Sequence, residues 1–522
     1  MDTPGSAPPS RYNFAAEIFV RNAERGGKAA YVDDHGSLTY GELATRSRRL
    51  ASALLALGVR REERVLVCLQ DTVDFPVTFL GCLYAGVVPV PVNTMLTVDD
   101  YAYMLEHSRA QALFVSGALL PALEQALARA AHEVRHVIVS RTAAEPTGGR
   151  IDFATWLAQA PPPAEHAAAT GADDVAFWLY SSGSTGRPKG TVHTHGNLHW
   201  TDELYARPIL ALGERDVVFS AAKLYFAYGL GNALTFPLSV GATAVLMVER
   251  PTPQAVFKRW VERKPTVYFG VPTLYAAMLA SPDLPRRADV ALRLCVSAGE
   301  ALPKEIGEKF SAHFGCDLLD GIGSTEMLHI FLSNRPGAVR YGTTGVPVPG
   351  YDLEVRGEDG RPVADGEIGD LYIRGPSAAL LYWGNREKTR STFEGGWTKS
   401  GDKYVRSADG YFTYSGRSDD MLKVGGLYVS PFEVEAALMR HEAVLEAAVV
   451  GKLEQGLTKT LAYVVLKPGR SGDDALAGAL QAFVKGQLAP YKYPREIRFL
   501  SELPKTATGK IQRFKLREAA AR

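Results

Sequence analysis

The alternation of helix patterns with buried-strand patterns in the first part of the chain is the feature that most constrains its fold. Residues 41–58 place four leucines on one helical face, and the apolar run RVLVCL follows as a buried strand. A second helix pattern begins after Thr97, a residue suited to cap it, and leads to the apolar run ALFVSG. Helices that alternate with buried strands predict parallel sheets that are covered by helices on both faces.

The pattern changes twice in the later part of the chain. Residues 350–415 contain short strands separated by turns, which predicts an antiparallel, barrel-like region. After the polar segment SGRSDD (415–420), helix and strand patterns interleave over a stretch the size of a small α+β domain. A chain of 522 residues also exceeds what one hydrophobic core usually supports.

We therefore predict an α/β protein with two domains. The large N-terminal domain, residues 1–418, would contain two parallel-rich sheets layered with helices and a small β-barrel subdomain. The small C-terminal domain, residues 419–522, would have an α+β fold.

Composition excludes several classes of function. A formal net charge of +1 provides no broad electrostatic field for nucleic acid or an anionic membrane, so we expect neither as a partner. The first residues lack a signal-peptide pattern, and the longest apolar run is too short to cross a bilayer. We expect a cytoplasmic protein whose cysteines are buried thiols, because none of them forms a CxxC pair: Cys68, Cys82, Cys295 and Cys316.

The segment YSSGSTGRPKG, residues 180–190, contains hydroxyls, glycines and two cations but almost no apolar side chain. Its glycines allow backbone N–H groups to converge on an anion, and Arg187 and Lys189 add positive charge. Strand patterns on both sides favour a phosphate-binding loop on a sheet, with a flexible linker as the alternative. The segment is not a Walker P-loop, because no Gly-Lys-Ser/Thr closes it and no helix pattern follows it directly.

Further segments carry polar residues that a hydrophobic core would not select. In DGIGSTE, Glu326 could ligate Mg²⁺ beside a phosphate, or the segment could cap a helix. SAGEALP (297–303) could equally be a capped turn. Asp402 and Arg417 suit sugar hydroxyls, whereas LPKTATGKIQR, which contains Lys510, is a basic segment of the kind that is usually solvated.

The order of these segments resembles that of the adenylate-forming superfamily, which includes acyl- and aryl-CoA synthetases, adenylation domains of nonribosomal peptide synthetases and firefly luciferase. Nearly the whole chain is spanned by segments in the family's order: YSSGSTGRPKG, GSTE, GEIGDLYIRG, TKSGDKY, YSGRSDD and PKTATGK. A closer likeness to benzoate–CoA ligases is carried by KLYFAYGLGN, GSTEMLHIF and RSDDMLKVGGLYVSP. The resemblance implies a ligase that forms the CoA thioester of benzoate or a closely related aryl carboxylate and releases AMP and pyrophosphate.

The resemblance also implies roles for individual residues. The ATP and AMP site would contain Ser181, Ser182, Gly183, Ser184, Thr185, Gly186, Lys189, Gly299, Glu300, Ala301, Asp320, Gly321, Ile322, Gly323, Ser324, Thr325, Asp402 and Arg417. The aryl pocket would contain Ala227, Tyr228, Gly229, Gly323, His329 and Ile330. The CoA tunnel would contain Gly425, Gly426, Leu427 and Tyr428, with Asp419 as the hinge. Catalytic roles would fall to Lys510, Thr185, Lys423 and the Mg²⁺ ligand Glu326, although Lys423 could equally be a surface lysine.

The chemistry implied by the resemblance needs a mobile cation rather than a general base. The first half-reaction brings the carboxylate and the α-phosphate together, and Lys510 would offset the repulsion between these two anions. The acid is already ionised at neutral pH, so the absence of a Ser-His-Asp or Cys-His pattern is expected. Rotation of the C-terminal domain about Asp419 would then withdraw Lys510 and form the CoA tunnel.

The expected partners are an aryl carboxylate, ATP and coenzyme A, with Mg²⁺ as cofactor; a homodimer and enzymes that acetylate or deacetylate Lys510 stay open. Rival hypotheses are adenylation for a carrier protein, a luciferase-like oxidation and a non-catalytic nucleotide or acyl-adenylate sensor. A sensor has no reason to keep the catalytic side chains Lys189, Glu326, Asp402, Arg417 and Lys510. His193 and His195 alternate on a strand, so we expect no shared metal ion, and we expect His195 to help close the phosphate loop.

Overall fold

The computed structural model describes residues 5–142, 147–183, 186–418, 420–424, 427–454, 457–488, 492–505 and 511–520. The chain divides into two compact units. Unit 1 comprises Met1–Leu353 and Ile373–Thr398, and unit 2 comprises Glu354–Tyr372 and Lys399–Arg522. The functional domain boundary that we predict between residues 418 and 419 stays a prediction.

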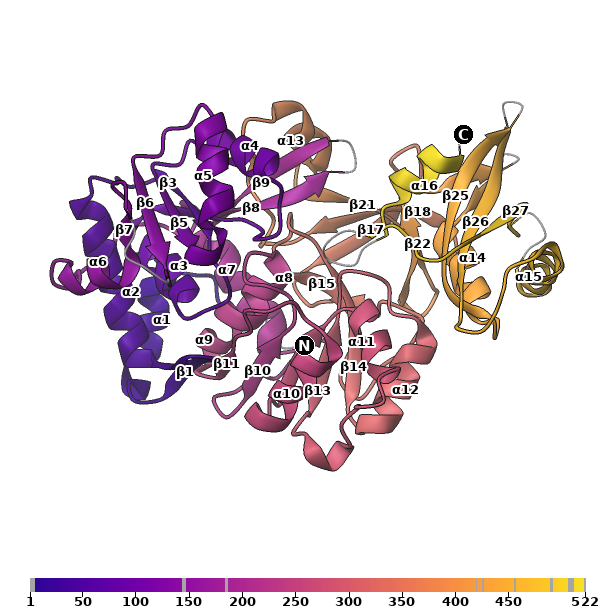
Figure 1. Cartoon of the computed structure of the whole chain (residues 1–522), viewed down its shortest axis with the longest axis horizontal. Helices are drawn as coiled ribbons and strands as arrows, with labels where there is room; N and C mark the ends of the chain where they lie inside the picture. Colours follow the sequence, from indigo (N-terminus) through magenta and orange to yellow (C-terminus); the bar gives the residue numbers. More distant parts are fainter. Residues whose placement is uncertain are drawn as a thin grey trace. The chain divides into compact units, whose positions relative to one another are not determined.

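Several expectations about the whole chain can be compared with the described ranges. Both units mix helices and strands, so the predicted α/β class is confirmed (Figure 1). All four cysteines are free, and Cys68, Cys82 and Cys295 are buried. No helix in these ranges has the length and apolar character that a membrane crossing requires.

A five-stranded parallel sheet, in the order β4-β3-β5-β6-β7, forms the first layered part of unit 1. Helices α4 and α5 pack on it through Tyr101, Met104 and Leu123. Both predicted helices are present, and Thr97 caps α4 with a capping box. The strands are β3 (Arg64–Cys68), β4 (Val88–Pro91), β5 (Ala112–Ser116), β6 (His136–Ser140) and β7 (Ile151–Asp152). The helices are α1 (Phe14–Arg21), α2 (Tyr40–Ala56), α3 (Asp74–Ala85), α4 (Val98–Ser108), α5 (Leu120–Arg129) and α6 (Phe153–Gln159).

A nine-stranded sheet, in the order β16-β15-β14-β13-β12-β10-β11-β1-β2, forms the second layered part. Gly270 and Ser297, the last residues of β12 and β13, align in register with Asp320 in the middle of β14, near the edge at which such sheets usually bind ligands. Helices α10 (Pro253–Arg263), α11 (Pro272–Leu279) and α12 (Lys304–Phe314) pack on it. The strands are β1 (Ala29–Asp33), β2 (Gly36–Thr39), β10 (Val217–Ser220), β11 (Thr243–Val245), β12 (Val267–Gly270), β13 (Leu294–Ser297), β14 (Asp317–Gly323), β15 (Ile330–Ser333) and β16 (Val346–Pro347).

The expected phosphate-loop segment lies within a β-hairpin. Strands β8 (Val175–Gly183) and β9 (Gly186–Thr194) flank it as predicted, but they extend into the segment expected to be a loop, because they pair antiparallel with Tyr180 opposite Gly190 and Ser181 opposite Lys189. Strand β19 (Leu381–Tyr382) pairs with β9 and thereby brings a segment distant in sequence beside the hairpin. The remaining helices of unit 1 are α7 (His195–Thr201), α8 (Ala227–Leu230), α9 (Phe236–Val240) and α13 (Arg386–Thr392).

The interleaved helices and strands predicted after residue 420 are present in unit 2. Strands β23 and β24 pair antiparallel, and α14 begins at Pro431 with Ser430 as its N-cap. Helices α14 and α15 pack through Val434, Leu438 and Leu480 on the sheet β25-β26-β27. The bounds are β23 (Leu422–Val424), β24 (Leu427–Val429), α14 (Pro431–Met439), β25 (Val444–Glu454), β26 (Leu457–Leu466), α15 (Asp474–Gln487), β27 (Glu496–Leu500) and α16 (Arg513–Ala520).

A five-stranded sheet corresponds to the predicted barrel-like region. Its order is β17-β18-β21-β20, with β22 paired to β21. The strands are β17 (Asp352–Arg356), β18 (Ile368–Arg374), β20 (Phe393–Glu394), β21 (Trp397–Arg406) and β22 (Phe412–Arg417).

Candidate active site

Each strand of the hairpin carries a polar side chain that lies close to Glu326. Ser181 on β8 and Lys189 on β9 are paired across the hairpin. Ser181 Oγ donates a hydrogen bond to Glu326 Oε1 at 3.2 Å, and Lys189 Nζ lies 4.0 Å from the same oxygen. Ser184 and Thr185 lie outside the described residues, and Ser182, Gly183 and Gly186 are described only as strand backbone. The structure thus joins the phosphate-loop motif to Glu326, the expected Mg²⁺ ligand.

Tyr382 is a fourth member of this cluster, and sequence reasoning missed it. Its hydroxyl donates to Glu326 Oε1 at 2.7 Å and accepts from Lys189 Nζ at 3.4 Å. The Lys189 and Glu326 side chains are only 16% and 15% exposed, so water screens their interaction weakly. Tyr382 gives no sequence signal because its neighbours in the segment LLYWGN are mostly apolar and none of them is charged.

The segment around Glu326 is a turn between two strands, so the alternative interpretation as a helix N-cap is wrong. β14 ends at Gly323, and β15, which pairs with it antiparallel, begins at Ile330. The intervening residues must reverse the chain direction and leave no length for a helix. Ser324 Oγ accepts from Met327 N at 3.1 Å and stabilises this turn.

The side chain of His193, on β9, contacts the backbone of the same turn. Its Nε2 lies 2.8 Å from Thr325 O and its Nδ1 lies 3.1 Å from Asn197 Oδ1. Burial lowers the pKa of His193 to about 4 and outweighs these two oxygen neighbours, which favour the protonated ring. Both oxygens only accept and a neutral ring has one N–H, so the shorter contact places the proton on Nε2, which donates to Thr325 O. His195, by contrast, accepts from Phe14 N at 3.3 Å and anchors the start of α1.

Helix α4 supports the hairpin through two aromatic side chains. Tyr103 Oη donates to Pro188 O at 3.1 Å, and the Arg187 guanidinium lies 5.0 Å from the centroid of the Tyr103 ring. His107 Nδ1 lies 2.9 Å from Tyr180 Oη, and burial lowers the pKa of His107. Both ends of the phosphate-loop segment are therefore fixed to one rigid helix.

The segments expected beside adenine lie at the carboxyl ends of β13 and β14. Asp320 pairs with Ser297 in register, and Asp320 Oδ1 is buried without a hydrogen-bond partner among the described residues. Burial raises the pKa of the Asp320 carboxyl well above its ordinary value. Gly299 adopts a left-handed φ of +94°, and Glu300 Oε2 accepts from Thr273 Oγ1 at 2.7 Å. Residues 298–303 precede α12 and contain no helix, as expected for a turn.

The residues expected to form the aryl pocket come from α8, from the end of β14, from the turn that follows it and from the start of β15. Ala227 and Tyr228 are half-buried, whereas His329 and Ile330 are buried. The rings of Tyr228 and His329 lie 5.6 Å apart, and His329 Nε2 lies 3.1 Å from Asn232 Oδ1. Burial lowers the pKa of His329 to about 3, so this side chain is neutral near pH 7.

The two pocket glycines are required by backbone packing. A Cβ at Gly229 would lie 2.0 Å from Lys223 O, and a Cβ at Gly323 would lie 2.5 Å from His329 O. Neither neighbour is a flexible side-chain end, so any larger residue would displace the backbone that carries the pocket.

Unit 2 brings together the two residues expected at the ribose. Asp402 and Arg417 are partners in the β21–β22 register, and Arg417 Nη1 lies 3.0 Å from Asp402 Oδ1. Asp402 is buried while Arg417 is exposed.

The remaining expectations in unit 2 fall on residues that are described in part or not at all. Asp419, Gly425, Gly426 and Lys510 lie outside the described residues, and for Lys423, Leu427 and Tyr428 only the strand backbone is described. The residues on either side of 506–510 are described, and these two residues, Lys505 and Ile511, form an antiparallel bridge.

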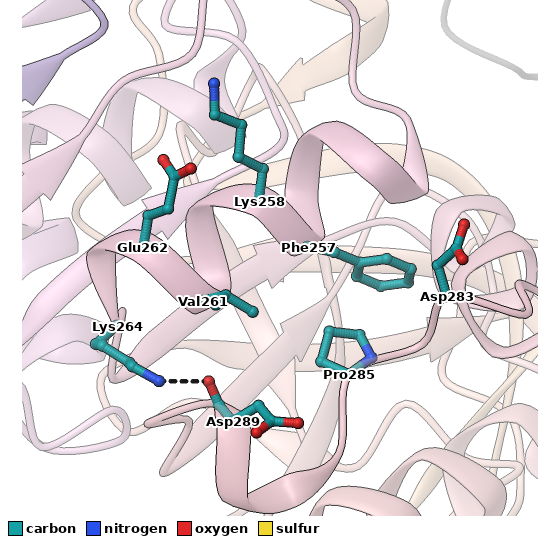
Figure 2. A pocket seen from close by; sticks show the side chains of 8 residues that line it. All are labelled: Phe257, Lys258, Val261, Glu262, Lys264, Asp283, Pro285 and Asp289. Atoms are coloured by element: carbon teal, nitrogen blue, oxygen red, sulfur yellow. Dashed lines mark hydrogen bonds between the residues drawn. The ribbon is translucent and has the colours of Figure 1, made fainter.

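A surface cavity of about 440 Å³ lies elsewhere on unit 1 (Figure 2). It is lined by side chains of α10, including Phe257 and Val261, and by Pro285 and Asp289. None of the expected site residues lines this cavity, so it is not part of the candidate active site.

Comparison with known proteins gives two family matches along the chain. The model of the AMP-binding enzyme family matches residues 18–383, and that of the AMP-binding enzyme C-terminal domain matches residues 433–510.

Individual relatives match over nearly their whole length. The chain is 58% identical to a benzoate–CoA ligase of Thauera aromatica over 516 residues, which cover 98% of this chain and 97% of that protein. It is 50% identical to a 4-hydroxybenzoate–CoA/benzoate–CoA ligase of Rhodopseudomonas palustris, and the match covers 98% of this chain and 95% of that protein. A crystallised benzoate CoA ligase from Burkholderia xenovorans LB400 is 64% identical, with a TM-score of 0.91 over 97% of this chain and 100% of that one.

Proposed function

Because the chain belongs to the family of AMP-binding enzymes, we propose that it is an ATP-dependent ligase that converts benzoate, or a closely related aryl carboxylate, to its CoA thioester with release of AMP and pyrophosphate. Support comes from the 58% identity with a benzoate–CoA ligase over nearly all of both chains. The observation that carries the proposal is the meeting of Ser181, Lys189 and Glu326 beside the hairpin bend. A hydroxyl, a cation and a carboxylate in one place suit phosphates that are bound with a divalent cation.

This cluster fits a Mg²⁺ ion that binds together with ATP. Mg²⁺ beside nucleotides usually takes one or two carboxylates and completes its shell with phosphate oxygens and water. Within the described ranges, no three His, Cys, Asp or Glu side chains gather to form a metal site of their own. Glu326 would therefore be the protein ligand of an ion that arrives with the nucleotide and offsets phosphate charge.

The nucleotide would extend from the hairpin to the carboxyl ends of β13 and β14. Asp320 Oδ1, a buried acceptor without a donor among the described residues, fits the exocyclic amine of adenine. The hairpin loop would bind the β- and γ-phosphates, and Thr325 would contact the α-phosphate. Asp402 and Arg417 would bind the ribose hydroxyls.

Lys510 would carry the first half-reaction. It offsets the repulsion between the substrate carboxylate and the α-phosphate, so that the carboxylate oxygen attacks phosphorus and pyrophosphate leaves. Rotation of residues 419–522 about Asp419 would withdraw this lysine. The thiol of CoA would then reach the mixed anhydride past Gly425 and Gly426, form the thioester and expel AMP, with Lys423 assisting.

The aryl specificity would arise from Tyr228 and His329. The two rings pack against each other, 5.6 Å apart, and would form one wall of planar groups, which suits a flat substrate better than a flexible aliphatic chain. Benzoate is the preferred acid in this proposal, and hydroxy-, amino- or halobenzoates are the alternatives. The homodimer, the acetylation of Lys510 and the cytoplasmic location stay predictions.

A panel of aromatic and aliphatic acids in ATP–pyrophosphate exchange tests the proposal. We expect the strongest exchange with benzoate, and thioester formation when CoA is added. A preference for medium-chain fatty acids would refute the aryl assignment. Transfer to a phosphopantetheinyl carrier protein but not to CoA would favour the carrier-loading alternative, and nucleotide binding without any exchange would favour a sensor.

A further inference from the structure

The geometry points to Tyr382 as a positioning residue that holds Glu326 and Lys189 apart, so that one offers a carboxylate oxygen to the cation and the other an ammonium group to the phosphates of ATP. This inference rests on the proposed function, because it concerns the same nucleotide site. It deepens that proposal by assigning a role to a side chain for which no role is expected from the motifs.

The backbone of Tyr382 is fixed by pairing with the hairpin. β19 places Tyr382 opposite Thr191 and Leu381 opposite Val192 on β9. Tyr382 N donates to Thr389 Oγ1 at 3.0 Å. The ring packs 5.4 Å from that of Phe393, and the residue is only 3% exposed. A ring that is held on so many sides presents its hydroxyl at one place.

The residues before Tyr382 also hold the turn that carries Glu326. Ala379 N donates to Glu326 O at 2.8 Å, and Ser377 Oγ donates to Met327 O at 2.8 Å. Leu380 N donates to Val192 O at 2.9 Å and attaches the same segment to β9. Residues 377–382 therefore connect the turn to the hairpin strand that bears Lys189.

The Tyr382 hydroxyl interacts with both charged groups at once. It donates to Glu326 Oε1 at 2.7 Å and accepts from Lys189 Nζ at 3.4 Å, while the ammonium lies 4.4 Å from the ring centroid. Hydrogen bonds to a charged partner are stronger than those between neutral groups. With Ser181 Oγ also donating to Oε1, this oxygen is occupied by two hydroxyls.

Two consequences follow for nucleotide binding. No hydrogen bond from the described residues reaches Glu326 Oε2, so Oε2 is the oxygen available to a cation and Glu326 would bind it through one oxygen. Lys189 Nζ and Glu326 Oε1 are 4.0 Å apart, at the outer limit of a direct ion pair. Without the hydroxyl, these two side chains would close into a tighter pair, and each would be less available to its substrate group.

The test is Tyr382→Phe, which removes the hydroxyl and keeps the ring. The readout is binding of Mn²⁺·ATP in the absence of acid and CoA, by electron paramagnetic resonance of Mn²⁺ and by calorimetry. We expect the dissociation constant of Mn²⁺·ATP to rise about tenfold, because Lys189 and Glu326, once they lose their hydrogen bonds to the hydroxyl, pair more tightly and are less available to the phosphates and the cation. With benzoate and CoA, the KM for Mg²⁺·ATP should rise by a similar factor and kcat should change less.

Tyr40→Phe is the matched control, because Tyr40 Oη is also buried and donates to a carbonyl, Ala242 O, at 2.6 Å. It should leave Mn²⁺·ATP binding unchanged. Ser181→Ala should weaken binding in the same direction as Tyr382→Phe, since Ser181 donates to the same oxygen.

Equal affinity of a folded Tyr382→Phe variant and the wild type would overturn the positioning role and leave the ligase proposal intact. A wild-type protein that binds no Mn²⁺·ATP at all would refute the ligase proposal, and the role of Tyr382 with it. Equal losses in Tyr382→Phe and Tyr40→Phe would also overturn the inference, because the effect would then be one of general destabilisation.

Discussion

Replacing His193 tests whether the turn that carries Glu326 is stabilised by the hydrogen bond between the buried His193 ring and Thr325 O. His193→Phe keeps a planar ring, which stacks on Phe177 at 5.2 Å and 16°, and removes the hydrogen bond to Thr325 O. A buried acceptor that loses its donor costs about 1–3 kcal/mol. Thr325 O retains Leu328 N at 3.2 Å, so we expect the lower part of this range, about 1–2 kcal/mol.

The loss of stability is measured as a decrease in the free energy of unfolding in urea. The effect on the site is measured by steady-state kinetics at varied ATP concentration. A loosened turn should lower kcat/KM for ATP about tenfold, which corresponds to about 1.4 kcal/mol. His193→Gln provides the matched comparison, because an amide N–H can restore the donor to Thr325 O, and it should recover part of both losses. The reasoning would be refuted by a His193→Phe protein whose stability and ATP kinetics equal those of the wild type.

Three further predictions concern other parts of the chain. Lys510→Ala should abolish ATP–pyrophosphate exchange while ATP still binds, and surviving benzoate turnover would show that this lysine is not the catalytic cation. Burial lowers the pKa of His195 to about 4, so the unfolded chain protonates this histidine at a higher pH than the folded chain does. The contribution of the neutral His195 to the free energy of unfolding is therefore fully present above about pH 6.5, and it falls by on the order of 3 kcal/mol towards pH 4. Urea unfolding at pH 7 and pH 4.5 should show a smaller difference for His195→Gln than for the wild type, and equal differences would contradict the assignment. Arg513→Ala should destabilise unit 2 by about 3–5 kcal/mol, because it leaves the buried Glu435 without its cation. Arg517→Ala removes the more exposed pair with Asp420 and should cost about 1 kcal/mol or less in the same urea assay; equal costs would contradict this argument.

The sequence alone predicted most secondary structure, because its signals are local. Apolar spacing marks α2, the Thr97 capping box marks the start of α4, and Pro431 after Ser430 marks the start of α14. The strand patterns on both sides of YSSGSTGRPKG predicted the two strands, whereas their antiparallel pairing as a hairpin was seen only in the structure. The turn at Glu326 was ambiguous, because hydroxyls followed by a carboxylate are typical both of helix caps and of phosphate sites.

Family membership and the identity of Lys189, Glu326, Asp402 and Arg417 as candidate residues were thus determined by the order of motifs in the sequence. Only the tertiary structure showed that Tyr382 and His193 contact the Glu326 turn, Tyr382 through pairing of β19 with β9 and His193 through a hydrogen bond from β9 across the fold. The physical reason is that helix periodicity and caps depend on residues within a few positions of one another. Contacts between residues 56, 132 or 193 positions apart depend on which strands pair and in which register, and no local pattern encodes that choice.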